Sequence, residues 1–310
     1  MRLIESKVGL LPQPAGLEGV YKQIEAAGRT CYKSEDKITT DSAKEFVERM
    51  VKNGHTAMLE HGTVYLYVKE TSESSKKDTA ACYELYNFYK SNKYSKVIGI
   101  GKANLIGHSN EYFITTNYRV IVENMRYEDL RNYLCEPMPQ HIKRVSCRFT
   151  CDRGVSHELV RHRVFSFAQE STRFCNYSKD KFNNELTFII PSWLNLNPGE
   201  YLLGRDGHGN RFIEGDGYYY DLSDGLSEEP AFIYTLWQAE KGYFTMLDLG
   251  WKAQQARQVL PNALKTEVVM TGFLDDWQHF FELRCAKNAH PDMQILANQL
   301  KEQFKKTGIL

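Results

Sequence analysis

The order of strand-like and helix-like patterns along the chain is the feature that most constrains its fold. Residues 144–151 (RVSCRFTC) alternate apolar and polar side chains, which predicts a strand with one buried face. Residues 275–286 (DDWQHFFELRCA) instead space their large apolar residues as one face of a helix. Segments of both kinds follow one another with no internal repeat and no series of β-α-β units. The sequence therefore predicts the α+β class, with a mixed or antiparallel sheet flanked by helices.

The other periodic segments extend this prediction. Helices are expected at residues 16–28, 42–52, 127–134, 156–165, 231–248, 251–260 and 292–305, and strands at residues 63–68, 112–124 and 186–191. Ser42 with Glu45 predicts a capping box, and Ser156 is a candidate N-cap. Residues 97–107 (VIGIGKANLIG) lack the spacing of a dinucleotide fingerprint or a P-loop and are expected to form a turn. Residues 195–229 are rich in Gly, Asp, Asn and Tyr, which predicts an irregular insertion or a hairpin.

Charge and cysteine content argue against several classes of protein. Lys plus Arg and Asp plus Glu are both 39, so the zero net charge gives no support for general nucleic-acid or membrane-surface binding. No apolar run reaches the roughly 18 residues of a membrane-spanning helix, and the first residues have too short an apolar stretch for a signal peptide. The seven cysteines include no CxxC pair, which predicts reduced thiols in a cytoplasmic protein. Neither the cysteines nor HTAMLEH (55–61) has the spacing of a zinc site, so no metal is expected.

Residues 161–174 (RHRVFSFAQESTRF) concentrate basic, hydroxyl and aromatic side chains. The stretch has two open interpretations: a solvated basic face, including a nucleic-acid patch, or a pocket that holds an anion against a flat ring. Two arginines further along the chain favour the pocket. Arg284 lies on the apolar stripe of its helix, where a guanidinium must be paired with a structural carboxylate or a ligand. Arg257 is a milder case of the same kind.

Three separate segments together resemble the flavin-dependent thymidylate synthases. RHRVFSFAQESTRF is similar to that family's signature RHR-x2-S-x-N-x2-S-x-R. NGHTAMLEH (53–61) resembles the family's upstream segment, and ARQVLP (256–261) followed by HFFELR (279–284) resembles its C-terminal pair of ligand-binding helices. The resemblance covers roughly residues 16–68, 144–193 and 250–300. It implies a single domain over residues 1–310, with insertions at about 69–143 and 195–230.

The resemblance also implies an activity, the formation of dTMP from dUMP. Methylenetetrahydrofolate would donate the one-carbon group, FAD reduced by NADPH would supply the hydride, and the enzyme would be a homotetramer with sites shared between subunits. The implied cofactor contacts are His55, Ala57, Glu60, Arg161, His162, Arg163, Gln169, Phe273, Leu274, Asp275 and His279. The implied dUMP contacts are Glu158, Arg161, Gln169, Glu170, Ser171, Thr172, Arg173, Arg257 (supplied by another subunit) and Arg284.

The implied chemistry needs no cysteine nucleophile. Arg284, as the catalytic residue at the N3 and O2 edge of uracil, would stabilise negative charge as it builds on the ring. Three positions depart from the family pattern: Ala168 replaces the signature asparagine, Gln169 stands where a carboxylate is frequent, and Phe174 lacks a phenolic hydroxyl. These departures keep two alternatives open, a nucleotide- or RNA-binding relative without turnover and a flavin-dependent uracil methyltransferase that acts on RNA. The zero net charge argues against RNA as the partner.

Overall fold

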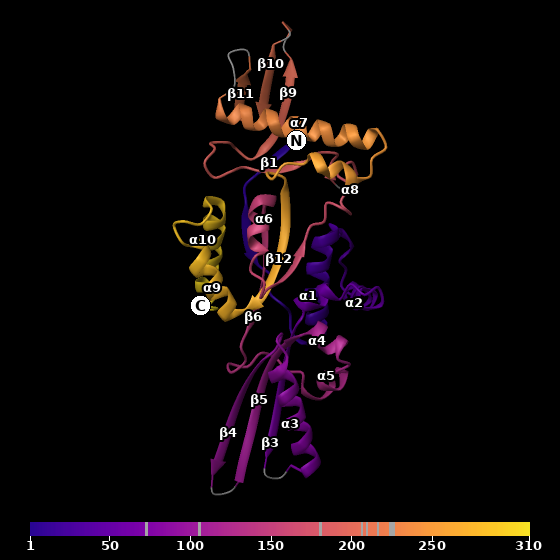
Figure 1. Ribbon diagram of the computed structural model, residues 1–310, viewed down its shortest axis with the longest axis vertical. Coiled ribbons are helices and arrows are strands. Elements are labelled where there is room, and N and C mark those ends of the chain that lie inside the picture. Colours follow the sequence, from indigo (N-terminus) through magenta and orange to yellow (C-terminus); the bar gives the residue numbers. More distant parts are fainter. Residues whose placement is uncertain are drawn as a thin grey trace.

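Three sheets follow one another along the long axis of the molecule (Figure 1). The structure is a computed structural model that describes residues 1–71, 74–104, 107–179, 182–205, 207–208, 210–215, 217–222 and 227–310. Helices lie against each of the sheets, and most strand pairs are antiparallel. The predicted α+β class is confirmed, with the strands divided among separate sheets.

The central sheet is built on the alternating segment that the sequence singled out. Its strands are β2 (Lys7–Leu10), β6 (Arg144–Asp152), β12 (Lys265–Phe273) and β7 (Ser166–Gln169), all antiparallel to their neighbours. Cys147, Phe149 and Cys151 face a core that helices α9 (Leu274–Arg284) and α10 (Pro291–Lys306) complete. The other face packs against α1 (Gly16–Tyr32), where Ala27 meets Ala168 and Val269. Helices on both faces therefore fix the position of this sheet.

An arm projects from one end of the central sheet (Figure 1). We define the arm as β3 (Thr63–Thr71), α3 (Lys76–Ser91), β4 (Lys96–Asn104) and β5 (Gly107–Asn117), with β5 in the middle of its sheet. The predicted turn at 97–107 is wrong for residues 97–104, which pair with β5 along β4, and residues 105 and 106 lie outside the described part of the chain. The predicted strand 112–124 is confirmed only to Asn117. The Asn117 side chain accepts the backbone N–H of Val120 at 3.2 Å and begins helix α4 (Tyr118–Glu123).

The third sheet lies at the opposite end of the molecule. Its order is β11 (Tyr218–Asp221), β10 (Arg211–Gly215), β9 (Gly199–Arg205), β1 (Arg2–Ile4) and β8 (Thr187–Ile189). The long helix α7 (Glu228–Asp248) packs against it through Ile233, Leu236 and Tyr243. The hairpin interpretation of residues 195–229 is confirmed for the part of that segment that the structure describes. The predicted helix 251–260 is instead a single turn, α8 (Ala253–Ala256), followed by a 3₁₀ turn at Arg257–Val259.

Helix ends differ from prediction where a cap or a close contact decides them. Helix α1 continues past its predicted end at Gly28. A Cβ at Gly28 would lie 2.5 Å from the Phe46 ring of α2 (Ser42–Lys52), so this glycine permits close packing of the two helices and does not end α1. The capping box at Ser42 is wrong, since its hydroxyl donates to Glu25 Oε2 at 2.9 Å. Helix α6 is Arg153–Leu159 and begins earlier than predicted, because Asp152 caps Val155 N–H at 2.9 Å. Predicted helices 127–134 and 292–305 correspond to α5 (Tyr127–Tyr133) and α10.

Candidate functional site

Arg284 is the centre of a compact group of polar contacts. Its Nη1 donates to Glu158 Oε2 at 2.6 Å and its Nη2 to the Glu158 carbonyl at 3.1 Å. Its Nε donates to His162 Nε2 at 2.9 Å. The side chain is 19% exposed, and that of Glu158 is 33% exposed. The sequence left open whether a carboxylate or a ligand pairs with Arg284, and in the structure the partner is the Glu158 carboxylate.

His162 is held neutral in this group. A guanidinium only donates hydrogen bonds, so Nε2 must accept, and the ring proton lies on Nδ1. Burial first, and then the positive charge of Arg284, lower the pKa of His162 to about 4. The ring also packs edge-on against Phe280, with centroids 5.0 Å apart. His162 therefore orients Arg284 without adding a second charge.

The arginines of residues 161–174 do not converge on one point. The RHR triplet follows the end of α6, where Arg161 and Arg163 are exposed on either side of His162. Arg173 is exposed as well, with its guanidinium 5.3 Å from the centre of the Phe174 ring. Within one chain, therefore, these side chains do not form the single anion pocket that was predicted.

Part of the predicted cofactor set meets where the arm joins the central sheet. A cavity of about 530 Å³, which we call the basic cleft, is lined by Glu60, Lys96, Arg144, Arg163, Phe165 and Phe273, among other residues. Glu60, Arg163 and Phe273 come from three different segments of the resemblance. Asp275 stands beside them, with its carboxylate 2.6 Å from Lys96 Nζ.

The other predicted cofactor residues lie elsewhere. His55 is exposed in a different cavity, of about 560 Å³, where its Nδ1 is 3.0 Å from the Tyr32 hydroxyl and Phe174 is a neighbour. Ala57 is exposed on the 3₁₀ turn Thr56–His61, and His279 is exposed on α9. Leu274 packs against the core of the central sheet.

The predicted dUMP contacts around the end of β7 are tied into the protein. The Gln169 amide donates to Ser156 Oγ at 2.9 Å and to Thr266 Oγ1 at 3.3 Å. Ser171 N–H donates to the Cys31 carbonyl at 3.0 Å. Arg257 Nη1 donates to Thr172 Oγ1 at 3.2 Å, so these two predicted contacts touch within one chain. The supply of Arg257 by another subunit stays a prediction.

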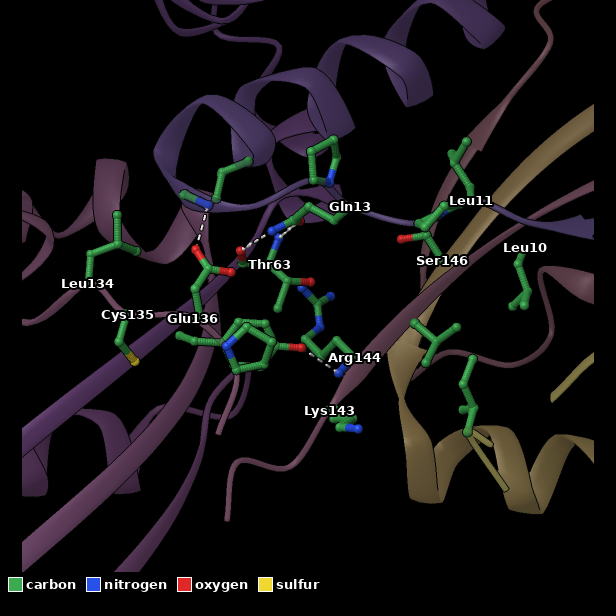
Figure 2. A pocket seen from close by; sticks show the side chains of 18 residues that line it. Leu10, Leu11, Gln13, Thr63, Leu134, Cys135, Glu136, Lys143, Arg144 and Ser146 are labelled. Carbon is green, nitrogen blue, oxygen red and sulfur yellow. Dashed lines mark hydrogen bonds between the residues drawn. The ribbon is translucent and has the colours of Figure 1, made fainter. Parts of the chain in front are cut away.

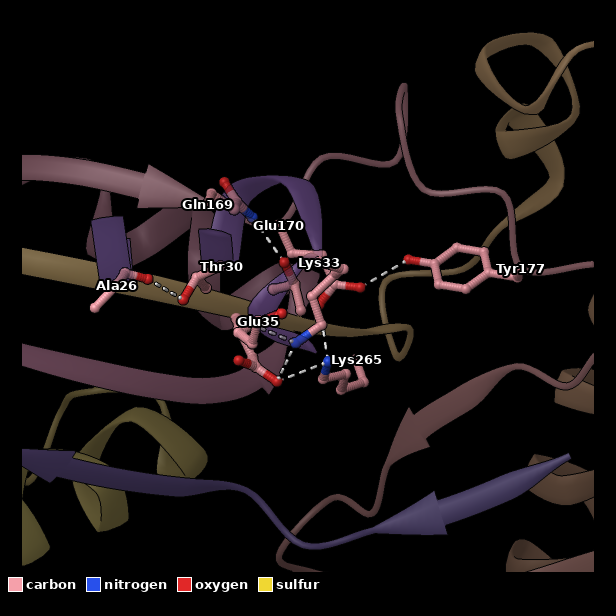
Figure 3. A network of polar contacts seen from close by, with 10 residues as sticks. Ala26, Thr30, Lys33, Glu35, Gln169, Glu170, Tyr177 and Lys265 are labelled. Atoms are coloured by element: carbon pink, nitrogen blue, oxygen red, sulfur yellow. Dashed lines mark hydrogen bonds and ion pairs between the residues drawn. The ribbon is translucent and has the colours of Figure 1, made fainter. Parts of the chain in front are cut away.

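Glu170 is held in a network of paired charges (Figure 3). Its side chain is 1% exposed, and its carboxylate accepts from Lys265 Nζ at 2.8 Å and from the Tyr177 hydroxyl at 3.2 Å. Lys265 also contacts Glu267 at 2.9 Å, and Glu267 in turn contacts Lys33 at 2.9 Å. Each of these charges is paired with a charge of opposite sign. The network therefore joins the end of α1 to β7 and β12 and supports residues 171–173.

Sequence reasoning missed Arg144, which lies between two cavities. One is the basic cleft; the other, of about 290 Å³, separates α1 from the start of β6 (Figure 2). In that second cavity Gln13 exchanges two hydrogen bonds of 2.8 Å with the backbone of Thr63, and Glu136 accepts Gly16 N–H at 2.9 Å. Its main polar groups are thus paired within the protein. The one available signal for Arg144 was its place as the first residue of the alternating segment 144–151, on the polar side of the pattern.

His61, a residue of the segment HTAMLEH (55–61), is a second buried polar group. Its Nδ1 is 2.8 Å from Thr271 Oγ1, which in turn lies 2.7 Å from Ser146 Oγ. Its Nε2 has no hydrogen-bond partner in the described part of the chain. Burial first, and then Arg144, lower the pKa of His61 to about 3. The neutral ring therefore joins the start of the arm to β6 and β12.

Metal-binding clusters and membrane-spanning helices are both absent from the described residues. No group of three or more His, Cys, Asp or Glu side chains there is arranged to hold a metal ion. None of the helices in the described ranges combines the length and the apolar character needed to cross a membrane. All seven cysteines lie in the described part, and none of them forms a disulfide.

Comparison with known proteins gives consistent results. Residues 17–79 and 116–307 match the family described as thymidylate synthase complementing protein. A flavin-dependent thymidylate synthase from Corynebacterium efficiens is 34% identical over 158 residues, 49% of this chain and 54% of that protein. One from Corynebacterium glutamicum is 22% identical over 283 residues, 91% of this chain and 74% of that protein. For the first of these the chain therefore spans about half the length of the curated relative.

Among solved structures, the chain is similar to a UMP/dUMP methylase PolB from Streptomyces cacaoi bound with 5-Br dUMP. It is 15% identical, with a TM-score of 0.41 over 99% of this chain and 93% of that chain. The family match, by contrast, includes most of the chain and all three segments that carried the sequence resemblance. The resemblance is thereby confirmed, and the chain belongs to the thymidylate synthase complementing protein family.

Proposed function

We propose that this chain is a flavin-dependent thymidylate synthase that reductively methylates dUMP to dTMP. Methylenetetrahydrofolate is the one-carbon donor, NADPH the reductant, and the enzyme is a cytoplasmic homotetramer with sites shared between subunits. Family membership and the names of the curated relatives support the reaction class. The observation that carries the proposal is the Arg284 group, a half-buried cation positioned by Glu158 and a neutral His162.

Arg284 is suited to stabilise negative charge on a pyrimidine ring. Two of its hydrogen bonds, to the Glu158 carbonyl and to His162, use fixed acceptors. The third goes to the Glu158 carboxylate, which is more exposed than Arg284 and is the acceptor that a ligand would replace. Nη1 would then donate to the N3 and O2 edge of uracil as C5 becomes nucleophilic. A preorganised donor of this kind lowers a barrier by roughly 3–4 kcal/mol.

The cysteines offer no competing nucleophile. The pKa values of six thiols are raised, in each case first by burial: Cys31, Cys82, Cys135, Cys147, Cys151 and Cys285. A reactive cysteine needs a lowered pKa, because the thiolate is the attacking species. Cys175, beside the signature, is buried in the core of the third sheet. Activation of C5 by charge stabilisation is therefore the route that these side chains support.

The residues of the basic cleft fit a flavin cofactor. Phe273 and Phe165 give it aromatic surface, and Arg163, Arg144 and Lys96 give it positive charge. One buried guanidinium nitrogen, Nε of Arg144, lacks a partner among the described residues, as a site for an anionic group requires. Bound FAD, once reduced, would supply the hydride for the methylene group. The protein's part is to bind, orient and exclude water.

The proposal is tested by the absorption spectrum of the purified protein and by dTMP formation. We expect a bound flavin whose spectrum changes on addition of dUMP. Arg284→Ala should nearly abolish dTMP formation in a chain that still folds, whereas Arg131→Ala, on the surface of α5, should not. Near-normal turnover by Arg284→Ala would contradict the role given to Arg284.

The same experiment separates the alternatives. A colourless protein that takes up no FAD but binds dUMP or RNA would indicate a binding protein without turnover. A flavoprotein that methylates uridine in RNA in preference to dUMP would indicate an RNA methyltransferase.

A further inference from the structure

The guanidinium of Arg144 is buried without a charge partner. Its Nη1 donates to the Glu60 carbonyl at 3.0 Å, and its Nη2 lies 3.5 Å from Ser166 Oγ, which is long for a hydrogen bond. Its Nε is buried and has no hydrogen-bond partner in the described part of the chain. Within that part, no carboxylate oxygen lies within 4.0 Å of its nitrogens, the distance that defines an ion pair. Burial lowers the pKa of Arg144 to about 10. A buried charge in this state is costly unless an anion accompanies it.

A second cation converges on the same place from the arm. Lys96 is the first residue of β4, and its Nζ lies 4.5 Å from the centre of the Phe273 ring. Arg144 Cζ lies 5.4 Å from the centre of that same ring. Two cations on one aromatic ring repel each other, and an anion between them removes the repulsion. Lys96 also pairs with Asp275, but that carboxylate is 59% exposed and such a pair opens at little cost.

The surrounding charges leave the basic cleft positive. Lys93, Lys96, Arg144 and Arg163 line it, opposed by Glu60 and Asp276. The Glu60 carboxylate is already paired with Arg119 at 2.6 Å. Asp276 accepts Phe273 N–H at 3.3 Å, and burial raises its pKa, which disfavours its charged form. The positive groups are thus the ones that remain available to a ligand.

We infer that Arg144, Lys96 and Arg163 form a phosphate-binding subsite in the basic cleft, completed by the arm. Guanidinium and ammonium groups on one side of a cleft are the donors that phosphate oxygens accept from. Lys96 lies in the stretch between residues 79 and 116, outside the residues that match the family. The source of the phosphate rests on the proposed function: it is either the diphosphate of FAD or the monophosphate of dUMP.

Binding measurements by titration calorimetry test the subsite with ligands that carry phosphate and ligands that lack it. FAD is compared with riboflavin, dUMP with deoxyuridine, and inorganic pyrophosphate is titrated alone. Lys96→Ala is the main variant because Lys96 is at the surface. Lys69→Ala, an exposed lysine of β3 in the same arm, is the matched control. Arg144→Lys and Arg144→Gln follow, with circular dichroism to check their folding.

We expect Lys96→Ala to weaken the binding of one phosphate-bearing ligand about tenfold or more. The affinity for the phosphate-free counterpart of that ligand should stay unchanged. Weaker binding of FAD but not of riboflavin would identify the diphosphate of FAD as the group bound at the subsite. Weaker binding of dUMP but not of deoxyuridine would identify the monophosphate of dUMP. Equal affinity of Lys96→Ala and the unsubstituted chain for all three phosphate compounds would overturn the inference. Should the unsubstituted chain bind neither flavin nor dUMP, the proposed function fails. In that case the pyrophosphate titration alone tests the subsite. Pyrophosphate binding that is lost in Lys96→Ala would support the subsite. No pyrophosphate binding, or binding that is the same in both chains, would overturn it.

Discussion

Replacing Glu267 with glutamine should destabilise the folded chain by about 3 kcal/mol at pH 7. Glu267 Oε1 accepts from Lys33 Nζ and from Lys265 Nζ, each at 2.9 Å (Figure 3). The Glu267 side chain is only 14% exposed. Glutamine keeps the volume and one acceptor oxygen, but it leaves two poorly hydrated ammonium groups with one carboxylate fewer. Glu35 and Glu170 still partly neutralise them.

Two estimates of the magnitude agree. Breaking a buried ion pair costs about 3–5 kcal/mol, and the remaining partners of the lysines place this case at the lower end. The pKa of Glu267 gives the second estimate. Burial would raise it, but Lys265 and Lys33 outweigh burial and lower it from 4.5 to about 2. At about 1.4 kcal/mol per pH unit, this difference also corresponds to roughly 3 kcal/mol.

Urea unfolding followed by tryptophan fluorescence at several pH values measures the effect. A carboxyl group with a lowered pKa stabilises the fold above its unfolded-state value, and this stabilisation is lost as the pH falls towards the folded-state value. The difference between the unsubstituted chain and Glu267→Gln should therefore shrink from about 3 kcal/mol at pH 7 to about 1.4 kcal/mol at pH 3. Glu302→Gln, on the exposed face of α10, should leave the midpoint unchanged. A loss below about 1 kcal/mol at pH 7, or a loss independent of pH, would refute the reasoning.

Three other predictions concern the core and the site. Because His61 is buried with a pKa of about 3, stability should fall by roughly 1.4 kcal/mol per pH unit below 6.5, and His61→Gln should flatten this dependence in thermal unfolding. Gly272→Ala would place a Cβ 2.3 Å from the Phe165 ring and should lower flavin affinity, whereas Gly9→Ala, with open space around it, should not. Each cysteine changed to Ser or Ala should leave dTMP formation possible; its complete loss in a variant that folds and binds both ligands would indicate a thiol nucleophile.

Local patterns predicted the fold where the same face of an element is buried along its whole length. Residues 144–151 are an example, since every second side chain packs against α9 and α10. The prediction failed where one side chain sets a boundary. Asp152 begins α6 before Ser156, and Asn117 ends β5 and begins α4, although the residues beyond it have strand-like composition. Such caps are single hydrogen bonds, so a pattern averaged over many residues does not locate them.

The candidate site was predictable in its residues and not in their arrangement. The position of Arg284 on an apolar stripe predicted a partner, and Glu158 fills that role from 126 residues away. Nothing local to Arg144 or Lys96 indicates that both reach Phe273. Arg144 does so because it pairs with Phe273 in neighbouring strands β6 and β12, and Lys96 does so because β4 begins where the arm joins the central sheet. The sequence also does not indicate that His55 and Glu60 line different cavities, because this depends on how a short 3₁₀ turn is oriented between the two cavities.

The arm is joined to the central sheet too closely for its deletion to be informative. Leu66, Tyr89 and Ile114 of the arm share one core with Ile24 of α1 and Phe46 of α2. Removing the arm would expose that core and destabilise α1, which also covers the central sheet. Loss of activity after such a deletion would report unfolding as much as any role in binding. Lys96→Ala changes the charge that the arm brings to the basic cleft and leaves the shared core intact, so point variants at the cleft are the changes that can assign a function to the arm.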